Sequence, residues 1–394
     1  MTSIVLPTIQ DARQYGYDSL PDPDDLYHSP EWLAMDESIG IARPFSVVSV
    51  PEGGAPAARA ATWGLVVEDT AFWPFMRIDH VLGTLLDERQ IARAPATEQM
   101  LADLMPNAYL GALRGGTTRL PVRGDLAGPQ AYHAIGEVLD GAEEMARAAG
   151  LRSVAFFYVP PEDLVLRRAL VRRGYIEFGP NHNVAVLRVG GQTFDEYLSG
   201  FGKRRRDSIR WERRKIAAAG VQIGCEELTT DLSRQMLPLE AQLYAKYGHH
   251  VYPEEMARIL HESVIRQYGG SAPVITARSA GVLRGYAAFI QINKALYSRD
   301  TGYDYTWPIR LPLYFEVLFY SAIELAMKSG IREIHYSYGS EDTKVSRGCD
   351  LRPRLGYLKA FDPGAAAQLV RLSSGLAPPK PDAAGALPAR NPGR

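Results

Sequence analysis

The chain has 394 residues, of which 46% are apolar and 23% are charged, so it can bury a large core and does not have the composition of a disordered or fibrous protein. Its length predicts two or three compact units. The longest apolar stretch, 311–327, is interrupted by Glu316 and Glu324, and residues 1–14 lack a basic segment followed by a long apolar run. We therefore expect no membrane span, no secretory signal and a cytoplasmic location.

Cysteine and charge content narrow the possible chemistry. Cys225 and Cys349 are the only cysteines and show no metal-ligand spacing, so we expect neither a disulfide framework nor a bound metal. The motifs GxSxG, GxxxxGK(S/T) and HExxH do not occur, which removes the commonest hydrolase, P-loop and zinc-protease interpretations. The net charge is −1, and only 8 of the 44 cationic residues are lysine, so a lysine at a candidate site is more informative than an arginine.

The first strong pattern along the chain is a helix followed by a buried strand. Two apolar runs, 60–69 and 70–78, predict strands. Residues 132–149 then place apolar side chains at helical spacing and end at Gly150, and the apolar run 151–159 predicts a buried strand.

The same order of elements returns in the second half of the chain. Three short β-branched and aromatic runs within 272–300 predict an antiparallel meander. A long apolar helix at 311–329 follows, ends at Gly330 and leads into a strand at 331–338, and the segments around Gly150 and Gly330 align without a gap. This internal repeat predicts an α/β protein with two tandem lobes, each a mixed, largely antiparallel sheet with packed helices.

The repeat also sets the expected domain boundaries. We expect an N-terminal lobe at 1–190 and a C-terminal lobe at 191–374. Residues 375–394 are rich in proline, alanine and glycine, so we expect a disordered tail there.

The most unusual composition lies at 203–215, where eight residues are basic and two are acidic. Asp207 and Ser208 can cap a helix on which Ile209 and Ile216 form a narrow apolar stripe, so the rest of its surface would be cationic. Such a surface attracts polyanions. The alternative is a solvated helix face with no ligand.

A second distinctive segment follows the strand predicted at 331–338. Lys344 and Arg347 are close enough in the sequence for both cations to face one anion or one developing oxyanion. Ligands of α/β sheets tend to bind at strand ends, and this segment leaves such an end. The alternative is that both cations pair with Glu341 and Asp342.

Polar aromatic residues precede the apolar helix. Tyr303 and Asp304 could line the same site as hydrogen-bond donors or as a proton acceptor. The alternative for the tyrosine is a core position with a satisfied hydroxyl. His249 and His250 are weaker candidates for a general base.

Taken together, four segments resemble one family. They are GKRRRDSIRWERRKIAAAGV (202–221), YSRDTGYDY (297–305), LYFEVLFYSAIELAMKSGI (313–331) and TKVSRGCDLRP (343–353). In this order they resemble the peptidoglycan-bridge transferase (FemABX-like) branch of the GNAT acyltransferase superfamily, whose members carry two tandem GNAT-like lobes. The resemblance covers about 190–362, and before that it is architectural only.

The resemblance implies acyl transfer to an amine, with aminoacyl-tRNA as the donor and no tightly bound cofactor. The acceptor would be a small-molecule amine of cell-wall or antibiotic-like secondary metabolism. Lys344 with Arg347 would supply positive charge at the oxyanion or at an acceptor phosphate, and Tyr303 or Asp304 would relay the amine proton. The residues expected to bind the donor are Lys203, Arg204, Arg205, Arg206, Arg210, Tyr336 and Tyr338.

Two alternatives remain open at this point. Ordinary GNAT enzymes use acyl-CoA and bind its pyrophosphate on a Gly-rich loop at the start of the central helix. The corresponding junction here, TGYDYTWPIRLPLY, contains Gly302 alone and two prolines, which favours the tRNA donor. The other alternative is a non-catalytic module that binds tRNA or another polyanion.

Overall fold

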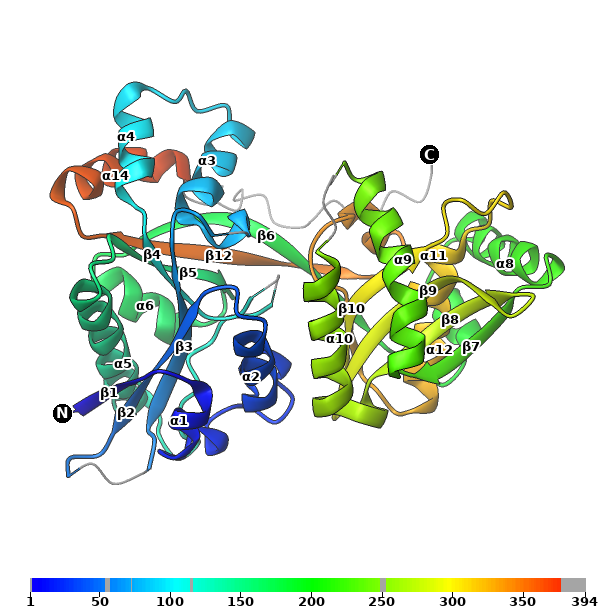
Figure 1. Cartoon of the computed structure of the whole chain (residues 1–394), viewed down its shortest axis with the longest axis horizontal. Helices are drawn as coiled ribbons and strands as arrows, with labels where there is room; N and C mark the ends of the chain where they lie inside the picture. Colours follow the sequence, from blue (N-terminus) through cyan, green and yellow to red (C-terminus); the bar gives the residue numbers. More distant parts are fainter. Residues whose placement is uncertain (1, 54–56, 72, 114–115, 249–252, 377–394) are drawn as a thin grey trace. The chain divides into compact units, whose positions relative to one another are not determined.

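The computed structural model describes residues 2–53, 57–71, 73–113, 116–248 and 253–376 (Figure 1). Contacts divide this part of the chain into two compact units. Unit 1 contains the described residues of Met1–Val184, Ser337–Gly339 and Leu351–Pro379, and unit 2 contains those of Ala185–Tyr336 and Ser340–Asp350. The expected tail at 375–394 lies, from residue 377 onward, outside the described residues. No helix in the described ranges is long and apolar enough to cross a membrane.

The sheet of unit 1 has the strand order β1-β2-β3-β4-β5-β12, with the first part of β6 beside β12. Strands β1 to β4 are antiparallel in turn, β4 and β5 are parallel, and β12 is antiparallel to β5. Every residue of β3, β4 and β5 is buried, as expected for central strands that are covered on both faces. The strands are β1 (Thr2–Leu6), β2 (Arg43–Val50), β3 (Ala60–Val67), β4 (Asn107–Leu110), β5 (Ser153–Val159), β6 (Ile176–Arg188) and β12 (Asp350–Ala360).

The long helix α5 organises the core of unit 1. It packs on β1, β2 and β3 and against α6, and its buried face includes Ile135, Val138 and Leu139. Figure 1 shows α4 beside α14, the last helix of the described chain. The helices are α1 (Ile9–Arg13), α2 (Pro30–Ser38), α3 (Ile78–Glu88), α4 (Pro95–Asp103), α5 (Gly128–Ala148), α6 (Leu164–Arg172) and α14 (Pro363–Leu376), with short 3-10 turns η1 (Tyr17–Ser19), η2 (Leu26–His28) and η3 (Pro74–Met76).

Unit 2 contains a sheet with the same pattern of strand directions. Strands β7 to β10 are antiparallel in turn, β10 and β11 are parallel, and the end of β6 is antiparallel to β11. Helix α9 packs on β10 and β9, and α10 lies against α9 (Figure 1). The strands are β7 (Gln222–Glu227), β8 (Pro273–Ser279), β9 (Val282–Ile292), β10 (Ala295–Tyr303) and β11 (Glu333–His335).

The helices of unit 2 include the basic segment and the interrupted apolar helix. They are α7 (Phe194–Ser199), α8 (Lys203–Ala218), α9 (Thr230–Lys246), α10 (Glu254–Tyr268), α11 (Leu313–Phe315), the π-helical segment η5 (Glu316–Tyr320), α12 (Ser321–Lys328) and α13 (Glu341–Val345), with a 3-10 turn η4 (Gly269–Ser271).

In both units of the predicted internal repeat, the helix before the parallel strand ends with the same hydrogen bond. In unit 1, Gly150 (φ 72°) follows α5, and the next N–H, of Leu151, donates to Ala146 O over 2.9 Å. In unit 2, Gly330 (φ 65°) follows α12, and Ile331 N donates to Ala326 O over 2.9 Å. This 6→1 bond beyond a left-handed glycine is the Schellman ending. In each unit it turns the chain from the helix into a strand parallel to the last strand of the meander, which confirms the predicted fold class.

Local predictions were less accurate. The apolar run 70–78 predicts a strand, but η3 forms there because Pro74 has no N–H for a ladder. The helix predicted at 311–329 is divided by η5, and the strand predicted at 331–338 ends at His335 because Ser337 (φ 57°) leaves the extended conformation.

Candidate active site

Strand β10 of unit 2 is paired with the parallel strand β11 over only part of its length. Residue pairing between β10 and β11 stops at Tyr297 and His335, whereas β10 continues to Tyr303 beside β9 after an irregularity between Ser298 and Thr301. The carboxyl ends of the two strands therefore have no ladder bonds to each other. Because ligands of α/β sheets bind at the carboxyl ends of strands, the residues gathered here form the candidate active site.

Two buried tyrosines stand at this end of the sheet. Tyr303 ends β10 and Tyr336 follows β11, and their rings are connected through Tyr314 and Phe319, with centroid distances of 5.8 Å for 303–314, 5.8 Å for 314–319 and 4.7 Å for 319–336. The hydroxyls of Tyr303 and Tyr336 are buried without a hydrogen-bond partner among the described residues. Burial raises the pKa of both well above the usual value. Both therefore stay protonated, with hydrogen-bonding capacity left for a ligand.

Lys344 lies beside Tyr336. It belongs to the short helix α13, its side chain is buried, and its Nζ donates to Tyr336 O over 2.6 Å. Burial lowers the pKa of Lys344 to about 8, although the charges of Cys349 and Glu341 act in the opposite direction. The ammonium therefore titrates near the physiological range, as is common for functional lysines.

Arg347 lies one turn after Lys344 and is buried in an ion pair with Glu212 of α8. Its Nη2 lies 3.2 Å from each Glu212 carboxylate oxygen, and its Nε donates to Tyr320 Oη over 3.2 Å. The hydroxyl of Tyr320 donates in turn to Glu212. The guanidinium also covers the ring of Phe315 at 3.7 Å. The charge of Arg347 is thus balanced within unit 2, and by Glu212 rather than by Glu341 or Asp342.

The π-helical segment η5 contributes to this cluster. It buries Glu316, whose Oε1 accepts from Ser321 Oγ at 3.0 Å and pairs with Arg213 Nη2 at 3.2 Å. Arg213 also binds Glu324, over 2.8 Å and 3.0 Å. Burial raises the pKa of Glu316 even though Arg213 opposes the shift. Segments of π-helix are frequent at functional sites, and this one faces α8 through these ion pairs.

Helix α8 has two different faces. Its buried side carries Ile209, Glu212 and Ile216. On its outer side the exposed cations Lys203, Arg204, Arg214 and Lys215 form no ion pair with any described residue. Trp211 stands among them with 54% of its surface exposed, and the Lys215 ammonium lies 5.3 Å from its ring centroid. Sequence reasoning missed Trp211, although a tryptophan inside a basic run was visible there.

The start of α8 differs from the prediction. Gly202 is the N-cap, and Asp207 and Ser208 lie inside the helix, where Ser208 Oγ donates to Glu212 over 3.2 Å. The first turn therefore carries three cations and no acid, at the helix end where negative charge is favoured.

Other predicted residues have protein partners or lie elsewhere. Arg206 donates to Phe201 O over 2.6 Å, and Arg210 forms an exposed pair with Asp195 at 3.2 Å. Tyr338 belongs to unit 1, where its ring stacks on His182 at 4.3 Å. The candidates His249 and His250 lie outside the described residues.

Both oxygens of the Asp304 carboxylate already accept hydrogen bonds from neighbouring residues. Burial alone would raise its pKa, but hydrogen bonds from Thr306 and Arg284 hold the pKa below the usual value. Arg284 Nη1 donates to one carboxylate oxygen over 2.6 Å, and the Trp307 N–H donates to the other over 3.0 Å. A carboxylate with these partners is a poor proton acceptor.

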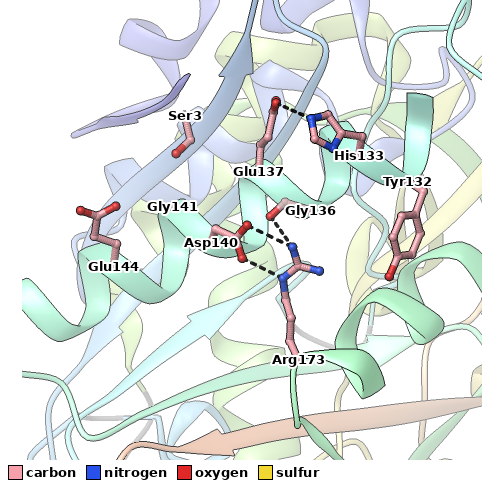
Figure 2. A pocket seen from close by; sticks show the side chains of 9 residues that line it. All are labelled: Ser3, Tyr132, His133, Gly136, Glu137, Asp140, Gly141, Glu144 and Arg173. Carbon is pink, nitrogen blue, oxygen red and sulfur yellow. Dashed lines mark hydrogen bonds and ion pairs between the residues drawn. The ribbon is translucent and has the colours of Figure 1, made fainter. Parts of the chain in front are cut away.

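A pocket of about 280 Å³ lies in unit 1 on one side of α5 (Figure 2). Four of its lining residues are paired with one another, because Glu137 contacts His133 Nε2 at 3.2 Å and Asp140 accepts from Arg173 Nε at 2.9 Å. None of the predicted site residues lines it. It is therefore separate from the candidate active site.

Comparisons with known proteins identify the family to which this chain is similar. The FemAB-like family model, described as peptidoglycan biosynthesis and recognition, matches residues 119–371. A search of curated protein sequences gives no match.

Solved structures share the fold at low sequence identity. FemX aligns over 95% of this chain and 100% of its own, with a TM-score of 0.60 and 10% identity. L-PGS from Bacillus licheniformis aligns over 95% and 98%, with a TM-score of 0.54 and 10% identity. The C-terminal domain of a putative lysylphosphatidylglycerol synthetase from Agrobacterium fabrum aligns over 92% and 96%, with a TM-score of 0.52 and 13% identity.

The family model defines the class of this protein as an acyltransferase. The family match covers more than half of the chain. The chain belongs to the FemAB-like family, which confirms the resemblance seen in the sequence.

Proposed function

We propose that the enzyme transfers an aminoacyl group from aminoacyl-tRNA to the amine of a small-molecule acceptor in cell-wall or secondary metabolism. This donor would require a cytoplasmic location. The observation that carries the proposal is the outer face of α8, where Lys203, Arg204, Arg214 and Lys215 are exposed and unpaired within the described chain.

The electrostatics of α8 favour a nucleic-acid ligand over a merely solvated helix. Cations in the first turn of a helix oppose the macrodipole, so this arrangement costs stability. A phosphate backbone at this helix end would be attracted both by the side chains and by the free N–H groups of the first turn. Trp211 adds an exposed aromatic face on which an unpaired base can stack.

The structure gives less support to an acyl-CoA donor. Gly302 packs against α9, and a Cβ there would lie 2.7 Å from Leu239 Cβ and 2.6 Å from the ring of Tyr286. Close packing explains this glycine without a phosphate ligand. The following helix begins after Pro312 with only three α-helical residues before η5. A long, regular helix start, as used for pyrophosphate, is not formed there.

The proposed chemistry needs an oriented amine and a charge at the oxyanion. The acceptor nitrogen attacks the ester carbonyl carbon, forms the C–N bond and leaves negative charge on the carbonyl oxygen. Collapse of this intermediate breaks the bond to the ribose oxygen of the tRNA, and that oxygen receives the proton that the amine loses. The products are an amide and deacylated tRNA. Positioning and electrostatic stabilisation supply most of the acceleration in such a reaction.

Residue roles follow from the environments described above. Protonated Lys344 is assigned to the oxyanion, because with a pKa of about 8 it is mainly charged at neutral pH. The hydroxyl of Tyr303 is assigned to the proton relay, because it can donate and accept and has no partner among the described residues. Arg347 is a positioning residue that holds this segment to α8.

The test is a transfer assay with a labelled aminoacyl-tRNA pool, with and without RNase, beside labelled acetyl-CoA. We expect transfer from the tRNA pool that RNase abolishes. The variant Lys203→Glu/Arg204→Glu/Arg214→Glu should weaken tRNA binding strongly, and the slope of log K against log salt should fall by about one for each phosphate-binding cation that is removed.

The matched control reverses three exposed arginines of unit 1, Arg43, Arg168 and Arg371, and should bind tRNA like the wild type. Arg206 is left intact because it donates to Phe201 O. Transfer that survives RNase, or that occurs only from acetyl-CoA, would refute the tRNA donor and favour an acyl-CoA-dependent enzyme.

A further inference from the structure

Arg354 of unit 1 is a buried guanidinium that forms no ion pair with any carboxylate in the described part of the chain. It lies within β12 with 4% of its surface exposed. Its Nε and Nη2 donate to Thr117 Oγ1 over 3.3 Å and 3.0 Å, and its Nη1 donates to Pro353 O over 3.0 Å. No carboxylate of the described residues pairs with it. Because guanidinium has five N–H groups, one on each terminal nitrogen remains available.

Charges of both signs lie near Arg354. Burial lowers the pKa of Arg354 to about 10, and the nearby charges of Arg352 and Arg119 act in the same direction, whereas Glu162 opposes them. Buried arginines are normally paired, because removing an isolated charge from water costs several kcal/mol. A buried guanidinium that forms no ion pair with any described residue is therefore an arrangement that a bound anion would stabilise.

The position of Arg354 in unit 1 is that of a ligand site. In the sheet, Leu355 pairs with Val159, so Arg354 stands at the carboxyl end of β5. There Tyr158 has a left-handed backbone (φ 59°), and its carbonyl accepts from Thr118 N over 2.9 Å. The Arg119 N–H is fixed by His28 Nε2 at 3.2 Å. Strained non-glycine backbone that is held by such bonds is concentrated at binding sites.

We propose that Arg354 and the hydroxyl of Thr117 form a binding site for a small oxyanion, namely a carboxylate or phosphate group of a ligand of unit 1. The free N–H groups of Arg354 would donate to the anion oxygens, and the hydroxyl hydrogen of Thr117 is available as a further donor. A planar guanidinium fork suits both anions, so the chemistry of the site is that of oxyanion recognition.

The experiment measures thermal unfolding of the full chain in inorganic phosphate and, separately, in acetate, with chloride keeping the ionic strength constant. We expect the wild-type Tm to rise saturably with one of the two anions, which identifies the group, and to rise less with chloride. In Arg354→Met this response should be lost, with an apparent Kd at least about tenfold weaker. Without anion, Arg354→Met should unfold no earlier than the wild type, because an unpaired buried charge has been removed.

Two further variants keep the outcome interpretable. Arg354→Lys retains the positive charge but lacks the planar guanidinium with its several N–H donors, so it should bind the same anion more weakly than the wild type. If Arg354→Met does not fold, the comparison of Arg354→Lys with the wild type tests the proposal. Arg168→Met removes an exposed arginine of α6 and should respond like the wild type. An undiminished anion response in Arg354→Met or Arg354→Lys, or no saturable response in the wild type, would overturn the proposal. Because the assay needs neither tRNA nor turnover, its result is independent of the proposed donor.

Discussion

The buried pair of Arg347 and Glu212 gives the sharpest quantitative prediction. Their side chains are 4% and 10% exposed, so each charge has left water and depends on the other. Removing one partner of such a pair costs about 3–5 kcal/mol, because the remaining charge is left buried. We expect Arg347→Met and Glu212→Met each to lose about this amount of unfolding free energy. The double variant should lose at least about 2 kcal/mol less than the sum of the two, because no unpaired charge is left.

Urea unfolding of the four proteins measures this coupling, provided that the m-value stays constant. A matched control on the same helix is Arg210→Met, which breaks an exposed pair whose side chains are 46% and 82% accessible, and which should cost at most about 1 kcal/mol. Strictly additive losses would refute the assignment of Arg347 as the residue that joins α8 to the segment containing Lys344. Transfer by a stable double variant at the wild-type rate would show that the reaction does not require the charge of Arg347.

Three further predictions concern pH and nucleic-acid binding. Lys344→Ala should lower turnover by about 100-fold, and the wild-type rate should fall as pH rises through about 8. Lys344→Arg should not show this fall, because arginine stays charged. A fall near pH 8 that persists in Lys344→Arg would exclude the oxyanion role. Burial lowers the pKa of His261, but the hydrogen bond with Glu240 (3.1 Å) more than compensates, so the net shift of the pKa is upward. The stability that this pair contributes is therefore complete below about pH 6.5 and is lost as pH rises through the folded-state pKa. The Tm loss in His261→Gln should be larger at acid than at alkaline pH. Trp211→Ala should weaken tRNA binding by about 1–3 kcal/mol without changing Tm, because its ring is exposed, and a Tm loss with unchanged binding would contradict this.

Regular local patterns allowed the architecture to be predicted. Gly150 and Gly330 each follow a helix with apolar periodicity, and the physics of a left-handed glycine cap is local, so the sequence is sufficient to find it. The π-helical segment and the early end of β11 were missed. Both depend on what packs around them, since Glu316 is held by Arg213 from α8 and Ser337 has an unusual φ without being a glycine. Such features have no local sequence signal.

For the candidate site, too, the sequence predicted the residues that a local pattern marks but not the distant residues that contact them. Lys344 and Arg347 were found from spacing and from the scarcity of lysine, but their partners were not. The sequence offered Glu341 and Asp342 as near neighbours, whereas Arg347 pairs with Glu212, 135 residues away. An acidic residue such as Glu212 inside a basic run is easily taken as a surface charge, and only the fold shows that it faces inward. Arg354 was likewise hidden in an arginine-rich segment, because the burial of an arginine and its lack of an ion pair with any described carboxylate cannot be read from a sequence.

The pairing of Glu212 has a consequence for how donor binding and chemistry are connected. Glu212 lies on the buried side of the helix whose outer side presents Lys203, Arg204 and Trp211. Arg347 N donates to Lys344 O over 3.0 Å, so the two cations share one turn of backbone. The Glu212 carboxylate thus connects α8 to the turn that contains Lys344. Because a misplacement of about 1 Å can cost about 100-fold in rate, we expect a shift of α8 on donor binding to change the transfer rate through the placement of Lys344.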